Sequence, residues 1–245
     1  MTSPEKPYFT PQVVSNLPVD KNHPLYARFA AEIQRFPQES VYIYSFDENK
    51  LLYAAGWQET LGYADDEIDL VTIVKQTDPY YAPFAYDLND CAVQFILSRK
   101  ERLLEYAVSM EVKKIHRNGH LVPMRVKLAI YSVHEDGRLQ SAIGRFQIDH
   151  SIRFGKVLRY AAFGPNKDDF EEALNQSLFK HITLSDKEKE AMVLVAQGMA
   201  FKEIADQLNI TVSAVEKRIL PLYKRFDVKS LPHLISFAYE NFILP

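Results

Sequence analysis

The sequence predicts an α+β protein, in which a five-stranded antiparallel sheet with helices is followed by an all-α domain of four helices. Two patterns support this expectation. Between residues 41 and 148, segments rich in β-branched and aromatic residues are joined by polar turns, which is typical of antiparallel strands. After residue 182, apolar residues recur at steps of three and four, which is typical of helices that share a core.

The composition is that of an ordinary globular protein. The 245 residues suffice for one large domain or two modest ones, and 47% are hydrophobic while 25% are charged. The net charge of −3 does not indicate a nucleic-acid partner, so a basic surface would have to be local. Cys91 is the only cysteine, which excludes an internal disulfide and fits a reducing compartment. Without a secretion signal or a membrane-spanning segment, we expect a cytoplasmic protein with no membrane partner.

The chain begins with an extension, residues 1–22, to which the sequence assigns no function. Residues 24–36 predict an amphipathic helix with Leu25, Phe29, Ile33 and Phe36 on one face, which needs a partner surface.

Five strands are expected between this helix and residue 150. A polar turn joins the first two, and Asn118-Gly119 supplies the left-handed backbone of a tight turn between the third and fourth. Helical segments at 56–68 and 83–99 separate the second strand from the third. The five strands are expected at residues 41–46, 51–55, 106–115, 121–133 and 141–148.

Two short motifs in this region resemble PAS domains. Residues 57–63, WQETLGY, followed by DDEI at 65–68, look like the helix after the second PAS strand. Arg117-Asn118-Gly119 resembles the PAS hairpin, although His150 stands where the family usually has an aliphatic residue after its final aspartate. The resemblance covers roughly residues 38–150 and implies a sensor or dimerisation domain, which we assign to residues 23–151.

Residues 152–181 are expected to link this domain to the next. Residues 152–163 fit either another strand or an irregular cover, and Gly164-Pro165 then breaks the chain. A short helix should follow, with Asp168 and Asp169 in its first turn. Two interpretations stay open for this helix, as a transmitter of a change in the sensor or as a passive spacer.

Residues 182–245 predict four helices. Ser185 and Glu188 have the spacing of a capping box at the start of the first helix, which should end at Gly198. Residues 202–208 form the second, and Thr211 is placed to cap the third. The third helix should bury one apolar stripe and expose a basic face opposite to it, while residues 230–244 form the fourth. The stripe comprises Val212, Val215, Ile219, Leu222 and Phe226.

This domain resembles the helix-turn-helix of LuxR/GerE-type regulators. The resemblance rests on Leu184-Ser185, Glu188, Ala196-Gln197-Gly198, Lys202-Glu203-Ile204-Ala205, Leu208, Ile210-Thr211 and Val215. It implies binding of double-stranded DNA, with bases read from the 213–217 region and phosphates held nearby. The DNA-contacting residues carried over are Lys202, Ser213, Lys217, Arg218, Lys224 and Arg225.

Pro221 is the main departure from that family. A proline inside a helix removes a backbone hydrogen bond at a cost of roughly 3 kcal/mol unless the helix bends. Two outcomes are expected, a kink over the DNA groove or a reorientation of the second half of the helix. Ala214 and Arg218 also replace the threonine and histidine that the family commonly has.

Other site chemistries are less well supported. Cys91 lacks the context of a flavin-linked thiol, and no histidine lies between residues 83 and 100 for a haem. Acidic pairs such as Asp65-Asp66 and Asp168-Asp169 are typical of helix starts rather than metal sites. We therefore expect no cofactor, no metal and no enzymatic activity. Two interpretations remain for the aromatic cluster in the 80–86 region, as the lining of a ligand pocket or as core; its members are Tyr80, Tyr81, Phe84 and Tyr86.

Together these patterns predict a transcription regulator in which a PAS-like domain, through sensing or dimerisation, controls a LuxR-type helix-turn-helix. A homodimer is expected from the family and from the apolar helix at 24–36, and a small-molecule ligand of the first domain stays open. One alternative is an acyl-homoserine-lactone receptor with the same C-terminal module. Another is a protein-interaction module that has lost DNA binding because of Pro221.

Overall fold

The chain forms two compact units in the computed structural model. The structure describes residues 15–154, 158–178, 184–226, 228–240 and 243–244. The first unit comprises residues 1–152 and 158–174, and the second comprises residues 153–157 and 175–245.

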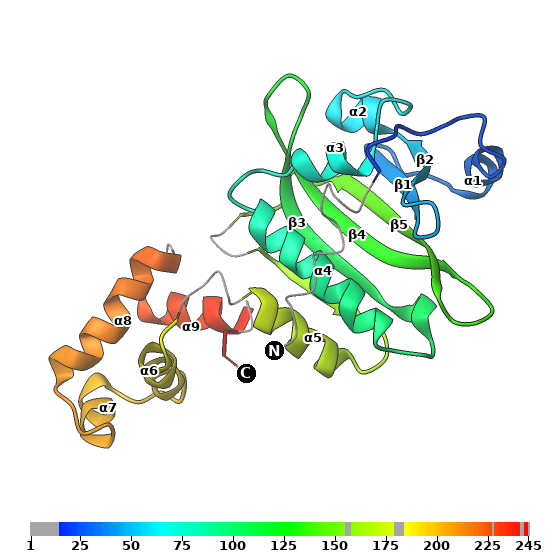
Figure 1. The fold of residues 1–245 in the computed structure, drawn as a ribbon. Coiled ribbons are helices and arrows are strands. Elements are labelled where there is room, and N and C mark those ends of the chain that lie inside the picture. The colour runs from blue at the N-terminus through cyan, green and yellow to red at the C-terminus, as the bar shows by residue number, and fades with distance from the viewer. Residues whose placement is uncertain (1–14, 155–157, 179–183, 227, 241–242, 245) are drawn as a thin grey trace. The chain divides into compact units, whose positions relative to one another are not determined.

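The first unit is built on one antiparallel sheet with the strand order β2-β1-β5-β4-β3-β6 (Figure 1). The five predicted strands are all present, and a sixth, β6, pairs with β3. Of the two alternatives for residues 152–163, a strand therefore forms at the end of that segment. The strands are β1 (Glu39–Ser45), β2 (Lys50–Ala55), β3 (Ala107–Ile115), β4 (Leu121–Val133), β5 (Leu139–Ile148) and β6 (Tyr160–Phe163).

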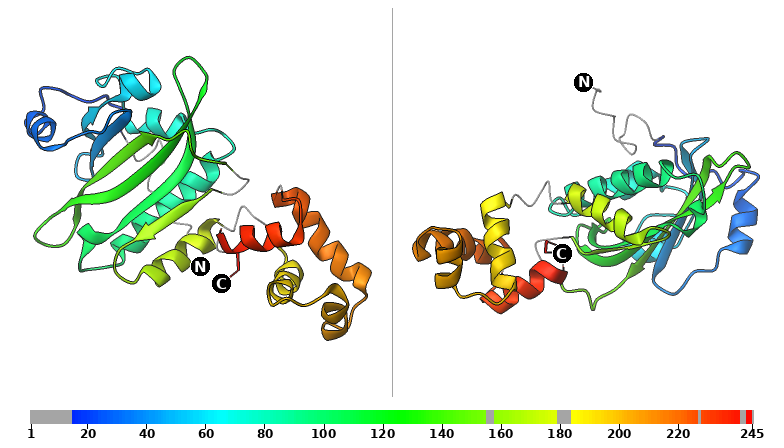
Figure 2. Two further views of the ribbon diagram at one scale, coloured as in Figure 1. Left: turned by 180° about the vertical axis from the view of Figure 1, so that it is seen from behind. Right: turned by 90° about the horizontal axis from the view of Figure 1, so that it is seen from below.

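Helices complete the first unit, and the longest of them, α4, lies against one face of the sheet (Figure 2). This sheet with helices has the PAS-like fold that the sequence predicts. The helices are α1 (Tyr26–Glu32), α2 (Trp57–Leu61), α3 (Leu70–Lys75), α4 (Ala82–Leu97), the 3-10 turn η1 (Leu103–Glu105) and α5 (Lys167–Leu178), of which residues 167–174 belong to this unit.

The α1 helix packs on the sheet face opposite to α4. Strand residues alternate between the two faces, so Val41 and Ile43 of β1 contact the cluster that contains Phe29 and Ile33. The helix is shorter than the predicted segment 24–36, because Ile33 already has an extended backbone. The prediction that Leu25 and Phe36 join the buried face is therefore wrong, since they are 36% and 70% exposed. The buried part of this face is covered by the chain's own sheet.

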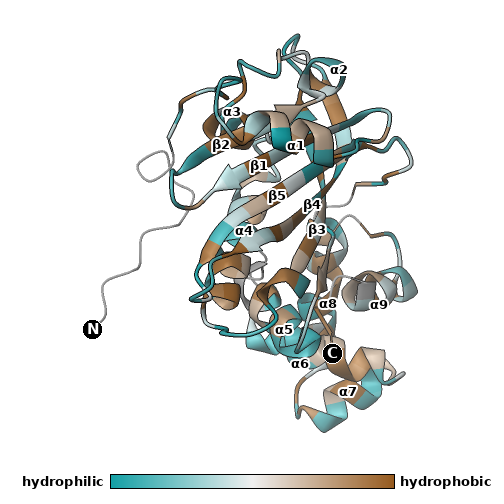
Figure 3. Ribbon diagram, turned by 90° about the vertical axis from the view of Figure 1, so that its right-hand side faces the viewer, coloured by the Kyte–Doolittle hydropathy of each residue, from teal (hydrophilic) through white to brown (hydrophobic). Residues whose placement is uncertain are grey.

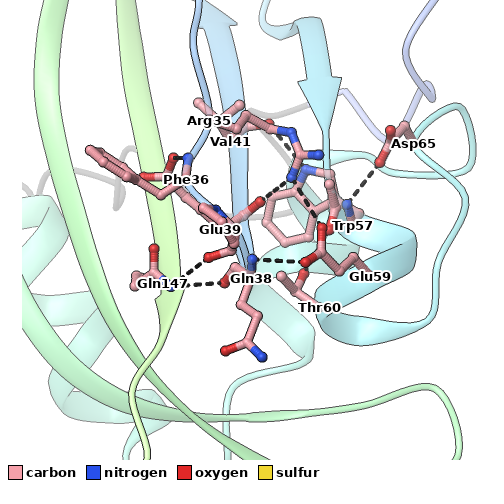
Figure 4. Close-up of polar contacts among 12 residues, drawn as sticks. Arg35, Phe36, Gln38, Glu39, Val41, Trp57, Glu59, Thr60, Asp65 and Gln147 are labelled. Atoms are coloured by element: carbon pink, nitrogen blue, oxygen red, sulfur yellow. Dashed lines mark hydrogen bonds and ion pairs between the residues drawn. The ribbon is translucent and has the colours of Figure 1, made fainter.

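The WQETLGY motif attaches α2 to the start of β1 (Figure 4). Trp57 is fully buried, and its indole Nε1 donates to the Val41 carbonyl at 3.1 Å while its backbone N donates to Asp65 Oδ1 at 2.8 Å. Gly56 precedes it with φ +85, and a Cβ there would meet the Arg35 guanidinium and the Glu39 carbonyl. The chain at Gly56 thus lies very close to residues 35–39, which explains why a glycine precedes the motif.

The first part of α5 belongs to the core of the first unit. Phe170 and Leu174 are fully buried, and the Phe170 ring stacks on Phe95 of α4 with centroids 4.6 Å apart. The Cys91 thiol donates to the Ala173 carbonyl at 3.3 Å, which places this half-buried cysteine between α4 and α5. A large part of the predicted linker segment is therefore packed against the sensor-like domain.

The second unit contains four helices in the described residues, and they carry hydrophilic as well as hydrophobic residues (Figure 3). Ser185 and Glu188 form the predicted capping box, and Gly198 follows the first helix with φ +88. The predicted course of the fourth helix over residues 241–242 lies outside the described residues. No described helix has the length and apolar character needed to cross a membrane. The four are α6 (Asp186–Ala196), α7 (Phe201–Gln207), α8 (Val212–Phe226) and α9 (Leu231–Glu240).

Candidate functional site

A tight turn fixes the angle at which α8 leaves α7. Asn209 adopts the left-handed conformation with φ +50, and the Ile210 amide donates to the Ala205 carbonyl at 2.9 Å. The Thr211 hydroxyl then accepts from the Ala214 amide at 3.2 Å, which satisfies a donor that the first turn of a helix leaves unpaired. The cap predicted at Thr211 is thus confirmed, and the two helices form a helix-turn-helix.

The apolar stripe of α8 faces the core on both sides of Pro221. Val215 and Ile219 before the proline are buried, as are Leu222 and Phe226 after it. The helix runs without a break from residue 212 to residue 226, so its second half keeps the same face inward. The predicted reorientation of that half is absent. Val212, at the start of the stripe, is 40% exposed and contributes less than predicted.

The opposite face of α8 carries a row of exposed residues. Ser213, Lys217, Leu220 and Lys224 follow one another at steps of four, three and four, and all are exposed. Lys202 is exposed on α7, the preceding helix of the motif. These positions include four of the six predicted DNA-contacting residues.

The other two predicted residues, Arg218 and Arg225, point toward α6. Arg218 Nη1 lies 3.2 Å from Glu190 Oε2, and its side chain is only 17% exposed. Arg225 Nη2 lies 3.0 Å from Glu188 Oε1, which ties the last turn of α8 to the first turn of α6. Arg218 and Arg225 are thus paired with carboxylates of their own domain, although the Arg225 side chain is still 38% exposed.

Glu188 takes part both in the capping box of α6 and in the ion pair with Arg225 of α8. Burial opposes its charged form, but hydrogen bonds from Arg225 and Ser185 outweigh burial and hold the pKa of Glu188 below its ordinary value. The carboxylate accepts from Arg225 Nη2 at 3.0 Å and from the Ser185 amide at 2.8 Å. Its ionisation therefore contributes to the packing of α8.

A second candidate site is a cavity of about 530 Å³ inside the first unit. Residues of the sheet, of α3 and of α4 line it, and most of them are apolar, including Leu70, Ile73 and Val126. The Tyr86 hydroxyl, on the α4 side, donates to the Val74 carbonyl of α3 at 3.0 Å. The volume is within the range of small-molecule sites.

The cavity divides the members of the aromatic cluster between its lining, the core and the surface. Tyr86 lines the cavity, whereas Tyr81 and Phe84 are buried outside its lining and Tyr80 is 50% exposed. One of the four predicted residues therefore belongs to a pocket wall, and two belong to the core.

Lys114 is a functional candidate that the sequence interpretation missed. It lines the cavity at the end of β3 and is only 5% exposed. Its Nζ donates to the Ile73 carbonyl at 2.7 Å and to Thr77 Oγ1 at 2.8 Å. Burial lowers the pKa of Lys114 to about 7. The missed signal was strand alternation, since Lys114 continues the inward parity of Met110 and Val112.

The acidic pair Asp65-Asp66 has structural partners. Asp65 accepts the Trp57 amide, and Asp66 forms an ion pair with Lys21 at 2.8 Å. Over the described residues, no three His, Cys, Asp or Glu side chains cluster in a way that could hold a metal ion.

Comparisons with known proteins match most of the second unit to a known family. Residues 182–238 match the family described as bacterial regulatory proteins, luxR family (GerE). The oxygen regulatory protein NreC of Staphylococcus haemolyticus is 34% identical over 61 residues, which are 25% of this chain and 28% of that protein. The transcriptional regulatory protein LiaR of Bacillus subtilis is 28% identical over 69 residues, which are 28% of this chain and 33% of that protein. The similarity thus spans about a third or less of these relatives.

Solved structures show more distant likenesses. A phage VqmA–DPO complex is 14% identical with a TM-score of 0.37, covering 89% of each chain. The N-terminal domain of a Marinobacter aquaeolei diguanylate cyclase with a PAS/PAC sensor is 14% identical with a TM-score of 0.34, covering 45% of this chain and 94% of the other. Likeness at this level assigns no function.

Proposed function

We propose that this chain is a DNA-binding transcription regulator whose PAS-like domain senses a small molecule, because residues 182–238 match the luxR family of bacterial regulatory proteins. The observation that carries the DNA-binding part is the division of α8 into a buried apolar face and an exposed face with Lys217 and Lys224. A helix of this kind fits the major groove of B-DNA, which is about 12 Å wide.

The exposed row on α8 suits the two parts of DNA recognition. Ser213 and Lys217 lie in the first half of the helix, from which helix-turn-helix proteins contact base edges. Lys224 near its end and Lys202 on α7 are exposed cations that suit phosphates on either side of the groove. Arg218 and Arg225 remain proposed contacts, but each would first have to leave its carboxylate on α6.

The cavity favours a sensing role for the first domain over dimerisation alone. A domain that only pairs two chains has no need for a cavity of about 530 Å³ lined by apolar residues and a buried lysine. A homodimer remains part of the proposal, since paired helix-turn-helix units bind two half-sites. The α1 helix does not supply that interface by its buried face, because Phe29 and Ile33 already pack on the sheet.

Selection from a pool of random duplexes tests the DNA-binding part. We expect the full chain to enrich a two-fold-related sequence, with half-sites spaced by one helical turn of about 10 base pairs or a multiple of it. The double variant Lys217→Ala, Lys224→Ala should enrich nothing, whereas Lys189→Ala, an exposed lysine on α6, should behave as the parent chain does. Failure of the parent chain to retain any duplex at low salt would contradict the proposal and favour a protein-interaction module.

A further inference from the structure

We propose that the cavity of the PAS-like domain takes a small organic carboxylate, with an oxygen of the ligand paired to Lys114 Nζ. This inference rests on the proposed sensing function and names the chemical class of its ligand. Its basis is the hydrogen bonding of Lys114, the charges that line the cavity, and the shape of the apolar wall.

The hydrogen-bond count at Lys114, in its protonated form, leaves one donor for a ligand. An ammonium group has three N–H donors. Two of them meet the Ile73 carbonyl and Thr77 Oγ1, at 2.7 Å and 2.8 Å. Within the described residues no third acceptor bonds this nitrogen, and the side chain is only 5% exposed. A buried donor without a partner is unfavourable. A hydrogen bond from this donor to a ligand acceptor therefore contributes more to binding affinity than the same bond at the surface.

The charge of Lys114 is also uncompensated in the described part of the chain. No carboxylate there forms an ion pair with it, and burial is the cause that lowers its pKa. The Lys114 Nζ lies over the Phe146 ring, 5.4 Å from its centroid. An anionic group beside Nζ would supply the missing opposite charge and favour the protonated lysine. A ligand carboxylate should therefore bind together with a proton.

The other polar groups of the cavity give the ligand a direction. Asp87 and Asp90 line the wall on α4, where they disfavour an anion. Lys114 lies on β3, so the carboxylate has a favourable end beside β3 and α3. The remaining titratable groups of the lining are Lys75 from α3, Tyr86 from α4 and Tyr42 from β1.

Apolar side chains define the rest of the ligand. Leu70, Val112, Val126 and Leu128 are among the apolar residues that line the cavity together with Lys114. Contact of these side chains with an apolar part of the ligand is favourable, whereas contact with a second charged group is costly. The ligand is thus a monocarboxylate with an aromatic or branched apolar part, of a size that about 530 Å³ can hold.

Matched pairs of acids and amides test this inference on the full chain. The probes are benzoate, phenylacetate and 4-methylpentanoate, each beside its own primary amide, with binding measured by titration calorimetry and ligand-observed NMR. We expect at least one acid to bind, more than tenfold tighter than its amide. Lys114→Met should remove this preference and Lys114→Arg should retain part of it. Absence of binding by all three acids at millimolar concentration, or a preference that survives in Lys114→Met, would overturn the inference.

A second measurement needs no variant and so does not depend on whether Lys114→Met folds. Calorimetry at pH 8 in two buffers of different ionisation enthalpy counts the protons taken up with the acid. In the protein without ligand the pKa of Lys114 is about 7, so this lysine is mostly neutral at pH 8. Because pairing with the acid favours the protonated lysine, we expect an uptake that approaches one proton per acid bound. Zero uptake would contradict the pairing. Duplex binding is measured on the same samples, so loss of DNA binding with acid binding intact counts against the proposed function alone.

Discussion

Lys114 and Lys217 place one residue type in two different environments. Lys114 is buried in the first unit between a carbonyl and a hydroxyl, and burial lowers its pKa to about 7. Lys217 is exposed on α8, in a row opposite to a buried apolar stripe. The difference teaches that a buried cation responds to what enters its cavity, whereas an exposed one offers a fixed charge to a polyanion.

The largest expected effect is on the stability of the first unit, and it tests whether α5 belongs to the core of that unit. Phe170→Ala removes a fully buried ring stacked on Phe95, so it should lower the free energy of unfolding of this unit by about 3 to 5 kcal/mol. Chemical denaturation measures the loss. Asp168→Ala, an exposed change in the first turn of the same helix, serves as the control and should alter stability by less than about 1 kcal/mol. Equal effects of the two changes would show that α5 is a spacer and not part of the core.

The next effect concerns the buried lysine. The pKa of Lys114 is lowered from 10.5 to about 7 in the folded state, so between these values the unfolded chain binds more protons. The free energy of unfolding should therefore rise by a few kcal/mol as pH increases from about 7 to about 10. Lys114→Met should lack this contribution, so its stability relative to the parent should decline as pH rises. An unchanged difference between the two proteins over this range would show that Lys114 is not buried.

A smaller effect separates exposed cations from paired ones. Lys217→Ala should weaken duplex binding and reduce the slope of log affinity against log salt by about 1, if Lys217 neutralises one phosphate. Arg218→Ala should change this slope less, because the Arg218 guanidinium pairs with Glu190 at 3.2 Å. Fluorescence anisotropy at several salt concentrations gives both slopes. A larger change for Arg218→Ala would mean that this arginine leaves Glu190 to bind DNA.

The smallest effect concerns the pair between α6 and α8. Arg225→Ala should destabilise the second unit by about 0.2 to 1 kcal/mol at neutral pH, the range of solvent-exposed ion pairs. Hydrogen bonds from Arg225 and Ser185 lower the pKa of Glu188 despite its partial burial, so this stability is present above the ordinary value of 4.5. It is lost as pH falls through the lowered pKa. Thermal unfolding of parent and variant should therefore converge once the pH lies below the lowered pKa of Glu188, and a gap that persists there would rule out Glu188 as the partner.

The second unit was predictable from the sequence because its signals are local. The capping residues Ser185 and Thr211 lie within three residues of the amides that they bind, and the stripe of α8 follows from helical spacing alone. Pro221 did not disturb that stripe, because a proline on the exposed face leaves the buried contacts unchanged. The direction of the Arg218 and Arg225 side chains was not predictable in this way, because it depends on carboxylates of α6.

The candidate site of the first unit was less predictable because its contacts are distant in sequence. Lys114 bonds to Ile73, 41 positions earlier in the chain, and only the sheet brings them together. The sixth strand was one of two open alternatives, since β6 is short and pairs with β3 about fifty residues earlier. The end of α1 was also missed, because apolar spacing at Leu25 and Phe36 continues beyond the part of the helix that the sheet covers.

Salt-dependent binding of a selected duplex tests the central claim most directly. The affinity of the full chain for the duplex should fall steeply between 50 and 200 mM salt. Over this range, proteins with six to ten phosphate contacts lose affinity by a factor of roughly 10³ to 10⁵. The variant Lys217→Ala, Lys224→Ala should show a slope shallower by about 2, with folding unchanged by circular dichroism. Identical slopes for parent and variant would contradict the assignment of the exposed face of α8 as the DNA-binding surface.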